Sequence, residues 1–137
     1  MRIRAAVCAC LLSPLALAEP ILQTGESWDG GAIAYPPGNA EVTAQILRLE
    51  AGQSAPFHCH PVPTMGYVLK GTAEVETIDG KRMIIGPGDP LVEVMRTVHR
   101  GTAVDGEVEI VVFYAGAEGV PTTVRPDEDP EGRYCDS

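Results

Sequence analysis

Short runs of alternating apolar and polar residues, separated by glycine and proline, make up most of the sequence. The clearest run is 72–78, in which small and apolar residues share one face of an extended strand and glutamates occupy the other. Asp79-Gly80 follows, a dipeptide typical of a two-residue hairpin turn, so residues 81–85 are predicted to form the partner strand. The sequence lacks long amphipathic helical patterns. The pattern therefore predicts an all-β sandwich or barrel.

Further strands are predicted on both sides of this hairpin, each bounded by turn residues: 42–49, 66–69, 91–95 and 107–114. These strands are expected to form one barrel over residues 41–120, preceded by an N-terminal strand or arm over residues 19–40. Residues 121–137 are acidic and contain little apolar material. Their composition predicts a tail that lies on the surface or is disordered.

The first residues have the pattern of a secretory signal peptide over residues 1–18. Two arginines precede a short apolar stretch, and Ala16-Leu17-Ala18 provides an A-x-A cleavage site. A membrane anchor is disfavoured because the apolar stretch is too short to span a bilayer. Lipidation of Cys8 or Cys10 is disfavoured because both lie very early and lack a suitable context. We therefore expect a periplasmic or secreted protein.

Cleavage changes the charge and the cysteine content of the mature chain. Loss of Arg2 and Arg4 would take the net charge from −9 to about −11. Such an acidic surface argues against nucleic acid or an anionic membrane as a partner. Cys59 and Cys135 would remain, and in an exported protein they either form a disulfide or stay a buried thiol and a tail thiol.

The histidines provide the strongest chemical signal. The sequence contains only three: His58 and His60, one residue apart, and His99. Side chains two residues apart on an extended strand point the same way, so His58 and His60 are predicted to aim at one point. Neutral imidazole suits Zn, Fe, Ni, Cu and Mn sites. Cys59 should face the opposite side, which favours packing or a disulfide over a role as a ligand.

Two motifs resemble those of the cupin superfamily. Gly52, His58 and His60, followed by the run 67–71, are similar to the first cupin motif. The turn 86–89, with His99 eleven residues beyond Gly88, is similar to the second. The resemblance implies a double-stranded β-helix, or jelly-roll, whose interior holds a metal ion and a small ligand. It also implies a homodimer that pairs through its sheets; an acidic monomer is the alternative.

The sequence departs from this resemblance at several positions. The first motif usually carries a glutamate ligand where this sequence has Thr64, followed by Met65. In the second motif, Val94 and Arg96 replace the usual proline and glycine. Glu93 interrupts an apolar run at a position that is usually hydrophobic and faces the interior, where a lone carboxylate is costly to bury. We expect Glu93 to bind the metal or to anchor its ligands; a solvated glutamate, or one paired with an arginine, is the alternative.

The arginines considered as partners of Glu93 are Arg48, Arg96 and Arg100. A small and largely aliphatic substrate pocket is expected, because only 5% of residues are aromatic. Residues predicted to line it are Thr64, Met65, Tyr67 and Met95.

Three histidines leave coordination positions open, which is typical of a catalytic metal site. The expected cofactor is one divalent ion, Fe, Mn, Zn or Ni. Iron would suit oxygen activation, and the other ions would suit Lewis-acid chemistry on a carbonyl. These considerations favour a metal-dependent oxygenase or isomerase acting on a small molecule. The alternatives are a non-catalytic protein that binds a metal or a small metabolite, and a structural cupin without metal, which the clustering of the histidines disfavours.

Overall fold

The structure, a computed structural model, describes residues 17–136. All but the last two residues of the predicted signal peptide, 1–18, lie outside the described residues. The fold is all-β, as the alternation predicted, and its only helical element among the described residues is a single 3-10 turn. In chain order the elements are β1 (Ala40–Leu49), β2 (Thr64–Thr77), β3 (Arg82–Ile85), β4 (Pro90–Val92), β5 (His99–Ala117) and η1 (Pro126–Glu128).

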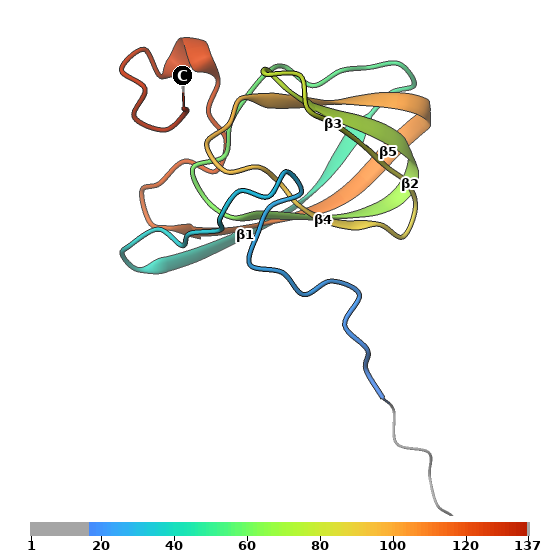
Figure 1. Cartoon of the computed structure of the whole chain (residues 1–137), viewed down its shortest axis with the longest axis horizontal. Helices are drawn as coiled ribbons and strands as arrows, with labels where there is room; N and C mark the ends of the chain where they lie inside the picture. The colour runs from blue at the N-terminus through green and yellow to red at the C-terminus, as the bar shows by residue number, and fades with distance from the viewer. Residues whose placement is uncertain (1–16, 137) are drawn as a thin grey trace, which may run out of the picture.

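The strands form one strongly curved antiparallel sheet in the order β1-β5-β2-β3, with β4 also paired to β2. Figure 1 shows these strands wrapped around a common interior. β5 is the central element, because it pairs with β1 along one edge and with β2 along the other. This arrangement brings His99, at the start of β5, close to the loop between β1 and β2.

The predicted hairpin is confirmed. The turn between β2 and β3 contains Gly80 with a φ of +92°, and the Thr77 N–H donates to the Lys81 carbonyl at 2.9 Å. The alternation on β2 is also confirmed, since Ala73, Val75 and Thr77 are buried. The glutamates of the opposite face form ion pairs with arginines on the outside.

The strands are longer than the sequence pattern predicted. β2 continues through Gly71, where a turn between two strands was expected. Gly71 has a φ of +71°, and a Cβ there would lie 2.1 Å from the Glu107 carbonyl oxygen, so only glycine permits this close approach. Irregular pairing between residues 68 and 73 lets the strand bend without ending. β5 likewise begins at His99 instead of residue 107.

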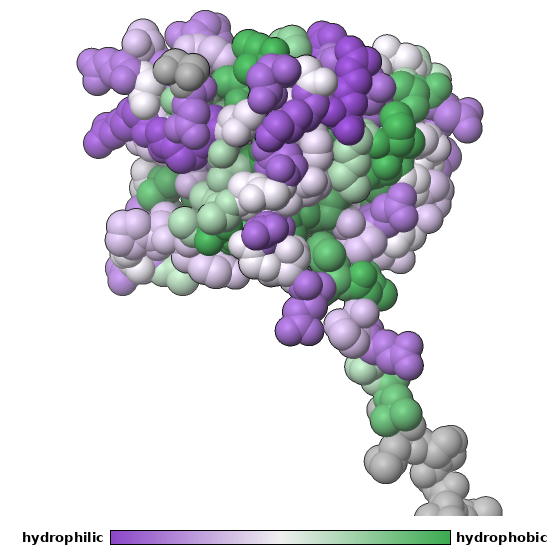
Figure 2. Space-filling view, viewed as in Figure 1, coloured by the Kyte–Doolittle hydropathy of each residue, from purple (hydrophilic) through white to green (hydrophobic). Residues whose placement is uncertain are grey.

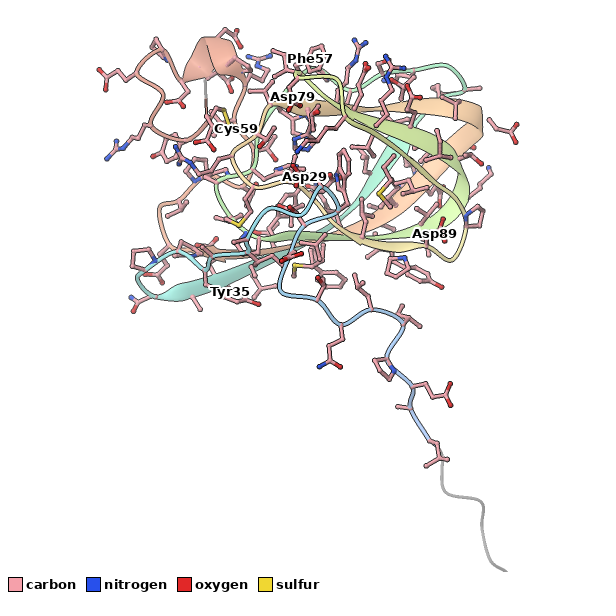
Figure 3. All side chains as sticks on the ribbon, in the orientation of Figure 1. Asp29, Tyr35, Phe57, Cys59, Asp79 and Asp89 are labelled. Atoms are coloured by element: carbon pink, nitrogen blue, oxygen red, sulfur yellow. A yellow bond between two sulfur atoms is a disulfide. The ribbon has the colours of Figure 1, made fainter. Side chains whose placement is uncertain are left out.

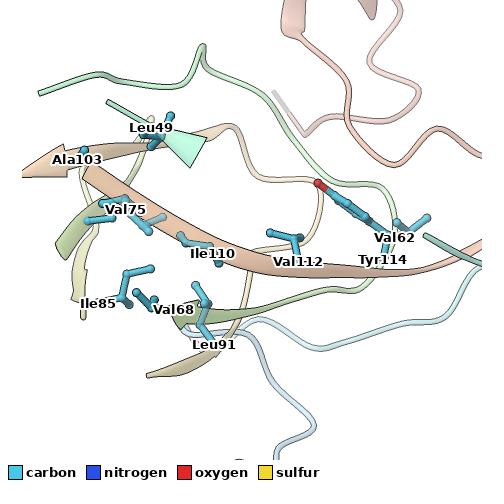
Figure 4. Packing of buried hydrophobic residues seen from close by; sticks show 12 residues of the cluster. Leu49, Val62, Val68, Val75, Ile85, Leu91, Ala103, Ile110, Val112 and Tyr114 are labelled. Carbon is cyan, nitrogen blue, oxygen red and sulfur yellow. The ribbon is translucent and has the colours of Figure 1, made fainter. Parts of the chain in front are cut away.

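The interior contains two hydrophobic clusters. Figure 4 shows the larger one, with aliphatic side chains of β2, β3, β4 and β5 at one end and Tyr114, Val62 and Val112 at the other. The smaller cluster joins Cys59 and Val98 to Val124 and Cys135 of the C-terminal segment. The C-terminal segment is therefore attached to the barrel through buried side chains.

The C-terminal segment and the later part of the N-terminal arm lie on the barrel, and the arm's first described residues extend away from it. In Figure 1 the N-terminal arm passes over β4, and the C-terminal segment with η1 lies at the opposite corner. Figure 2 shows hydrophilic residues gathered along the upper part of the viewed face, beside the C-terminal segment. Within residues 17–136, no helix has the length and apolar character needed to cross a bilayer.

Candidate metal centre

His58 and His99 are aligned by their backbones. The His58 N–H donates to the His99 carbonyl at 2.9 Å, and the His99 N–H donates to the His58 carbonyl at 2.8 Å. This reciprocal pair forms an antiparallel bridge, so the two side chains stand next to each other on the same side. The position of His99 is thus set by β5 pairing with the loop that carries the other two histidines.

Backbone hydrogen bonds also hold His60, which lies on the same extended loop as His58. Its carbonyl accepts the Arg96 N–H at 2.8 Å. Between the two histidines, Cys59 exchanges two backbone hydrogen bonds with Val124, and its side chain points the other way to form a disulfide with Cys135. Figure 3 shows Cys59 beneath the C-terminal segment. The pairing that the sequence left open is therefore present, and it fixes the centre of the H-x-H segment.

The three imidazoles converge. One ligand atom from each of His58, His60 and His99 lies within 4.8 Å of the others, and the ring centroids are 4.6 to 5.0 Å apart. His60 and His99 are buried, and His58 is half-buried. Three imidazole nitrogens at such separations can hold a metal ion between them.

Backbone carbonyls orient all three rings. The Nδ1 atom of His58 lies 2.7 Å from the Pro56 oxygen, that of His60 lies 2.8 Å from the Thr122 oxygen, and that of His99 lies 2.8 Å from the Thr97 oxygen. A carbonyl only accepts hydrogen bonds, so each Nδ1 carries the proton. Each Nε2 is then left with its lone pair. This is the tautomer a metal ligand needs, and backbone carbonyls commonly fix it in metal sites.

Burial keeps the rings uncharged. Desolvation lowers the pKa of His58 and His99, and it lowers that of His60 well below the usual value. Mutual repulsion between the imidazolium forms adds to the effect at His58 and His60. Protons therefore compete weakly with a metal ion for these nitrogens near neutral pH.

Glu93 reaches the same cluster. Its Oε2 atom lies 3.6 Å from His99 Nε2, and both atoms are buried without a hydrogen-bond partner among the described residues. Burial raises the pKa of Glu93 to about 7, against the opposing effects of His58 and Trp28. A bound cation would satisfy both unpartnered atoms, so this donor set fits a metal ion.

The arginine alternative for Glu93 is wrong. Each of the three arginines pairs with another carboxylate: Arg48 with Glu109, Arg96 with Asp136 and Arg100 with Glu76. Arg96 instead shapes the loop, since it is the one non-glycine residue with a positive φ, at +62°, in the described part of the chain. It fills the atypical position of the second motif and binds the C-terminal segment.

The cluster opens into a cavity of about 270 Å³ inside the barrel. Thr64 lines this cavity, as predicted, together with aliphatic residues of β1, β2 and β5. Met65, Tyr67 and Met95 do not line it, and their prediction as pocket residues is corrected. Side chains alternate between the two faces of β2, and Met65 and Tyr67 lie on the face opposite to that of Thr64. Met95 points toward the N-terminal arm, where its sulfur lies 3.3 Å from the Ala34 nitrogen.

Tyr114, whose type and position predict a core or pocket residue, lines this cavity together with two residues that were not predicted. Tyr114 has its ring centroid 5.6 Å from that of His60, and its hydroxyl accepts a hydrogen bond from Gln45 at 2.8 Å. Thr123 and Arg125 come from the C-terminal segment, which was treated as a tail. No sequence pattern placed the C-terminal segment at the cavity.

A curved antiparallel barrel with histidines converging on an interior cavity defines a jelly-roll protein with a metal-competent site. Residues 45–115 match the family described as "Cupin domain". The chain belongs to the cupin family, as its two motifs suggested. None of the curated proteins matches it.

Solved structures share this fold at low sequence identity. DMSP lyase DddQ from Ruegeria pomeroyi DSS-3 is 24% identical with a TM-score of 0.55, over 64% of this chain and 44% of that one. Polyketide cyclase RemF from Streptomyces resistomycificus is 18% identical with a TM-score of 0.53, over 64% and 61%. Oxalate decarboxylase from Lactobacillus farciminis is 16% identical with a TM-score of 0.53, over 61% and 26%. The chain thus spans less than two thirds of each of these three proteins.

Proposed function

We propose that this protein is an exported, single-domain cupin that binds one divalent metal ion, Fe, Mn, Zn or Ni. With this ion bound, it would act as an oxygenase or isomerase on a small molecule. The observation that carries the proposal is the convergence of three deprotonated Nε2 atoms on the wall of the cavity inside the barrel. His58, His60 and His99 are the proposed ligands, with Glu93 as a further ligand. The metal would supply Lewis-acid or oxygen-activating chemistry when bound.

The chain itself would select and orient the substrate. The cavity walls are mainly aliphatic, with Leu47, Val75 and Ile110 facing inward, so they favour a small molecule with apolar parts and exclude water from it. Gln45 and Tyr114 line the same cavity and offer polar atoms for hydrogen bonds to the substrate. A group with a pKa of about 7, such as Glu93, can both take up and release a proton at neutral pH.

Metal content is the first test. Protein purified without chelators and without a metal-affinity tag should contain about one equivalent of one ion by elemental analysis, and the His99→Ala variant should contain far less. Met65→Leu is a matched control, because Met65 lies outside the cavity and its replacement should leave the metal content unchanged. Wild-type protein with no more metal than His99→Ala would contradict the proposal.

Turnover is the second test. The metal-loaded protein should consume oxygen, or interconvert isomers without oxygen uptake, with at least one compound from a panel of small carbonyl and phenolic compounds. A protein that binds metal and shifts its melting temperature with a panel compound, but converts none, would instead be the non-catalytic binding protein that the sequence left open.

Export and dimer formation belong to the same proposal. The Cys59–Cys135 disulfide supports an oxidising compartment such as the periplasm or the extracellular space. The exposed apolar residues Val42, Ile46 and Phe113 on the paired strands β1 and β5 support a homodimer joined through this sheet. Fractionation of cells that express the full chain, and sedimentation of the mature protein, would test the two statements separately.

A further inference from the structure

Trp28 is brought to the metal centre by the N-terminal arm. It is the only tryptophan in the sequence, and it lies in a turn closed by a bridge between Glu26 and Ala32. Its backbone N–H donates to the carbonyl of Val92 at 2.9 Å, one residue before Glu93. The turn is therefore attached to the barrel next to the proposed carboxylate ligand.

Short hydrogen bonds hold this turn in place. Within the turn, the Ser27 N–H donates to the Gly31 carbonyl at 2.8 Å, and the Ser27 hydroxyl donates to Asp29 Oδ1 at 2.7 Å. Asp29 Oδ2 pairs with Lys81 Nζ at 3.0 Å, which ties the arm to the turn between β2 and β3. Figure 3 places Asp29 at the front of the barrel, where the arm crosses it. The Trp28 side chain itself packs against the larger hydrophobic cluster.

The indole N–H faces the carboxylate of Glu93. Its presence lowers the pKa of Glu93, in opposition to the larger effect of burial. Even so, Trp28 Nε1 and Glu93 Oε2 are both buried without a partner of full hydrogen-bond geometry among the described residues. Together with His99 Nε2, they are the buried side-chain nitrogen and oxygen atoms that have no hydrogen-bond partner among residues 17–136. Glu93 and His99 line the cavity, and Glu93 connects Trp28 to His99.

We propose that Trp28 is a positioning residue for the metal site: its indole N–H binds one carboxylate oxygen of Glu93 and directs the other oxygen toward the ion held by the histidines. This inference rests on the proposed metal site. An ionised carboxylate inside a protein needs donors as well as the metal, because a half-satisfied buried charge is costly. Lysine and arginine side chains of residues 17–136 form no ion pair with Glu93, which leaves the indole as its neutral donor.

The consequence is that the arm forms part of the functional unit, although it lies outside residues 45–115, which match the family. A positioning residue of this kind typically changes metal affinity about 10-fold to 100-fold when it is lost. The effect should act through Glu93, so it should vanish when Glu93 is already replaced.

A double-mutant cycle with Zn²⁺ tests the proposal. Wild type, Trp28→Phe, Glu93→Gln and the double variant are titrated with Zn²⁺ against a competing chelator. We expect Trp28→Phe to weaken binding about 10-fold or more, and the double variant to bind no more weakly than Glu93→Gln alone. Tyr35→Phe, which removes a hydroxyl from an exposed aromatic ring of the same arm, should bind as wild type does.

Failure of the metal site and failure of the positioning role of Trp28 give different outcomes. If wild type binds no Zn²⁺, the metal site fails and the positioning role fails with it. If wild type binds Zn²⁺ through the histidines but Trp28→Phe binds equally well, or the two single effects simply add, only the role of Trp28 is overturned.

A spectroscopic measurement covers the case in which Trp28→Phe does not fold. Uniformly ¹⁵N-labelled protein gives a single indole N–H resonance, because Trp28 is the only tryptophan. Zn²⁺ should move this resonance downfield and slow its exchange with solvent in wild type, and should do neither in Glu93→Gln. An indole resonance that Zn²⁺ leaves unchanged in wild type would overturn the proposal.

Discussion

Glu93, the residue after β4, lies beside Thr64, the first residue of β2, and the Glu93 backbone N–H donates to the Thr64 carbonyl at 2.9 Å. The neighbouring pair, Met65 and Val92, continues the same register. Thr64 stands where the first cupin motif usually carries a glutamate, and both Thr64 and Glu93 line the cavity. The carboxylate that the first motif lacks is thus present directly after the neighbouring strand β4, beside Thr64.

This relationship predicts that a carboxylate at position 64 can replace the carboxylate of Glu93. Glu93→Gln should weaken metal binding, and adding Thr64→Glu to it should restore at least part of the lost affinity, because the new carboxylate starts from the neighbouring position. The measurement is Zn²⁺ affinity by competition with a chelator. Restoration by Thr64→Gln in place of Thr64→Glu would show that the carboxylate is not what matters.

Glu93 should destabilise the metal-free protein at alkaline pH. Its pKa rises from 4.5 in the unfolded chain to about 7 in the folded one. Between these values the folded state binds more protons than the unfolded state, so stability falls as pH rises through this window. The full cost above pH 7 is at most roughly 3 kcal/mol.

Glu93→Gln removes this cost. In the presence of a chelator, the variant should unfold at a higher temperature than wild type at pH 8 and at nearly the same temperature at pH 5. The lowered pKa values of His60 and His99 act on both proteins alike, and at His58 the variant loses only the smallest of the contributions to the pKa. A variant that is less stable than wild type at pH 8 would contradict the assignment of Glu93 as a buried, uncompensated carboxylate.

Metal affinity should depend on pH in two stages. As pH falls below about 7, Glu93 becomes protonated, so each metal ion must displace about one proton and affinity declines gently. The imidazoles take up protons only at lower pH, because burial lowers the pKa of all three. The decline should therefore steepen below pH 6.5, and Glu93→Gln should lack the first stage. A steep loss of affinity that begins above pH 7 would contradict the buried, neutral histidines.

The disulfide should support both stability and the metal site. Cys59 lies between two proposed ligands, and the bridged C-terminal segment provides the Thr122 carbonyl that accepts the His60 Nδ1–H at 2.8 Å. Cys135→Ser should lower the free energy of unfolding by about 2–5 kcal/mol, since the bridge closes a long loop. It should also weaken metal binding, because His60 loses part of its orientation.

Urea unfolding and Zn²⁺ titration measure the two effects. Wild type treated with a dithiol reductant serves as the control and should behave as Cys135→Ser does. If the variant keeps the unfolding midpoint and the Zn²⁺ affinity of oxidised wild type, the bridge has neither role.

Local patterns predicted the parts of the fold that depend on neighbouring residues. The Asp79-Gly80 turn and the alternation before it depend on backbone geometry within a few residues, and both are present. Gly71 also signals a special conformation, but a local pattern cannot distinguish a turn from a bend inside a longer strand. The Glu107 carbonyl that makes glycine necessary there lies far away in sequence.

The site shows the same division. His58 and His60 could be paired from their spacing, and the second motif added His99. Met65 and Tyr67 were assigned to the pocket by residue type, although alternation from the inward-facing Thr64 places them outside. Trp28 and Thr122 could not be found from sequence, because an arm and a tail reach the barrel only through long-range contacts. The disulfide fixes one of these contacts, and the sequence left its formation open.

The most direct measurement of the central claim is a crystal structure of protein purified without chelators, with diffraction data collected at the absorption edge of the ion found by elemental analysis. We expect one anomalous peak between the Nε2 atoms of His58, His60 and His99, at about 2.0–2.3 Å from each, with the Nδ1 atoms still bound to carbonyls. A protein whose anomalous map is empty at this position, or shows the ion elsewhere, would contradict this claim.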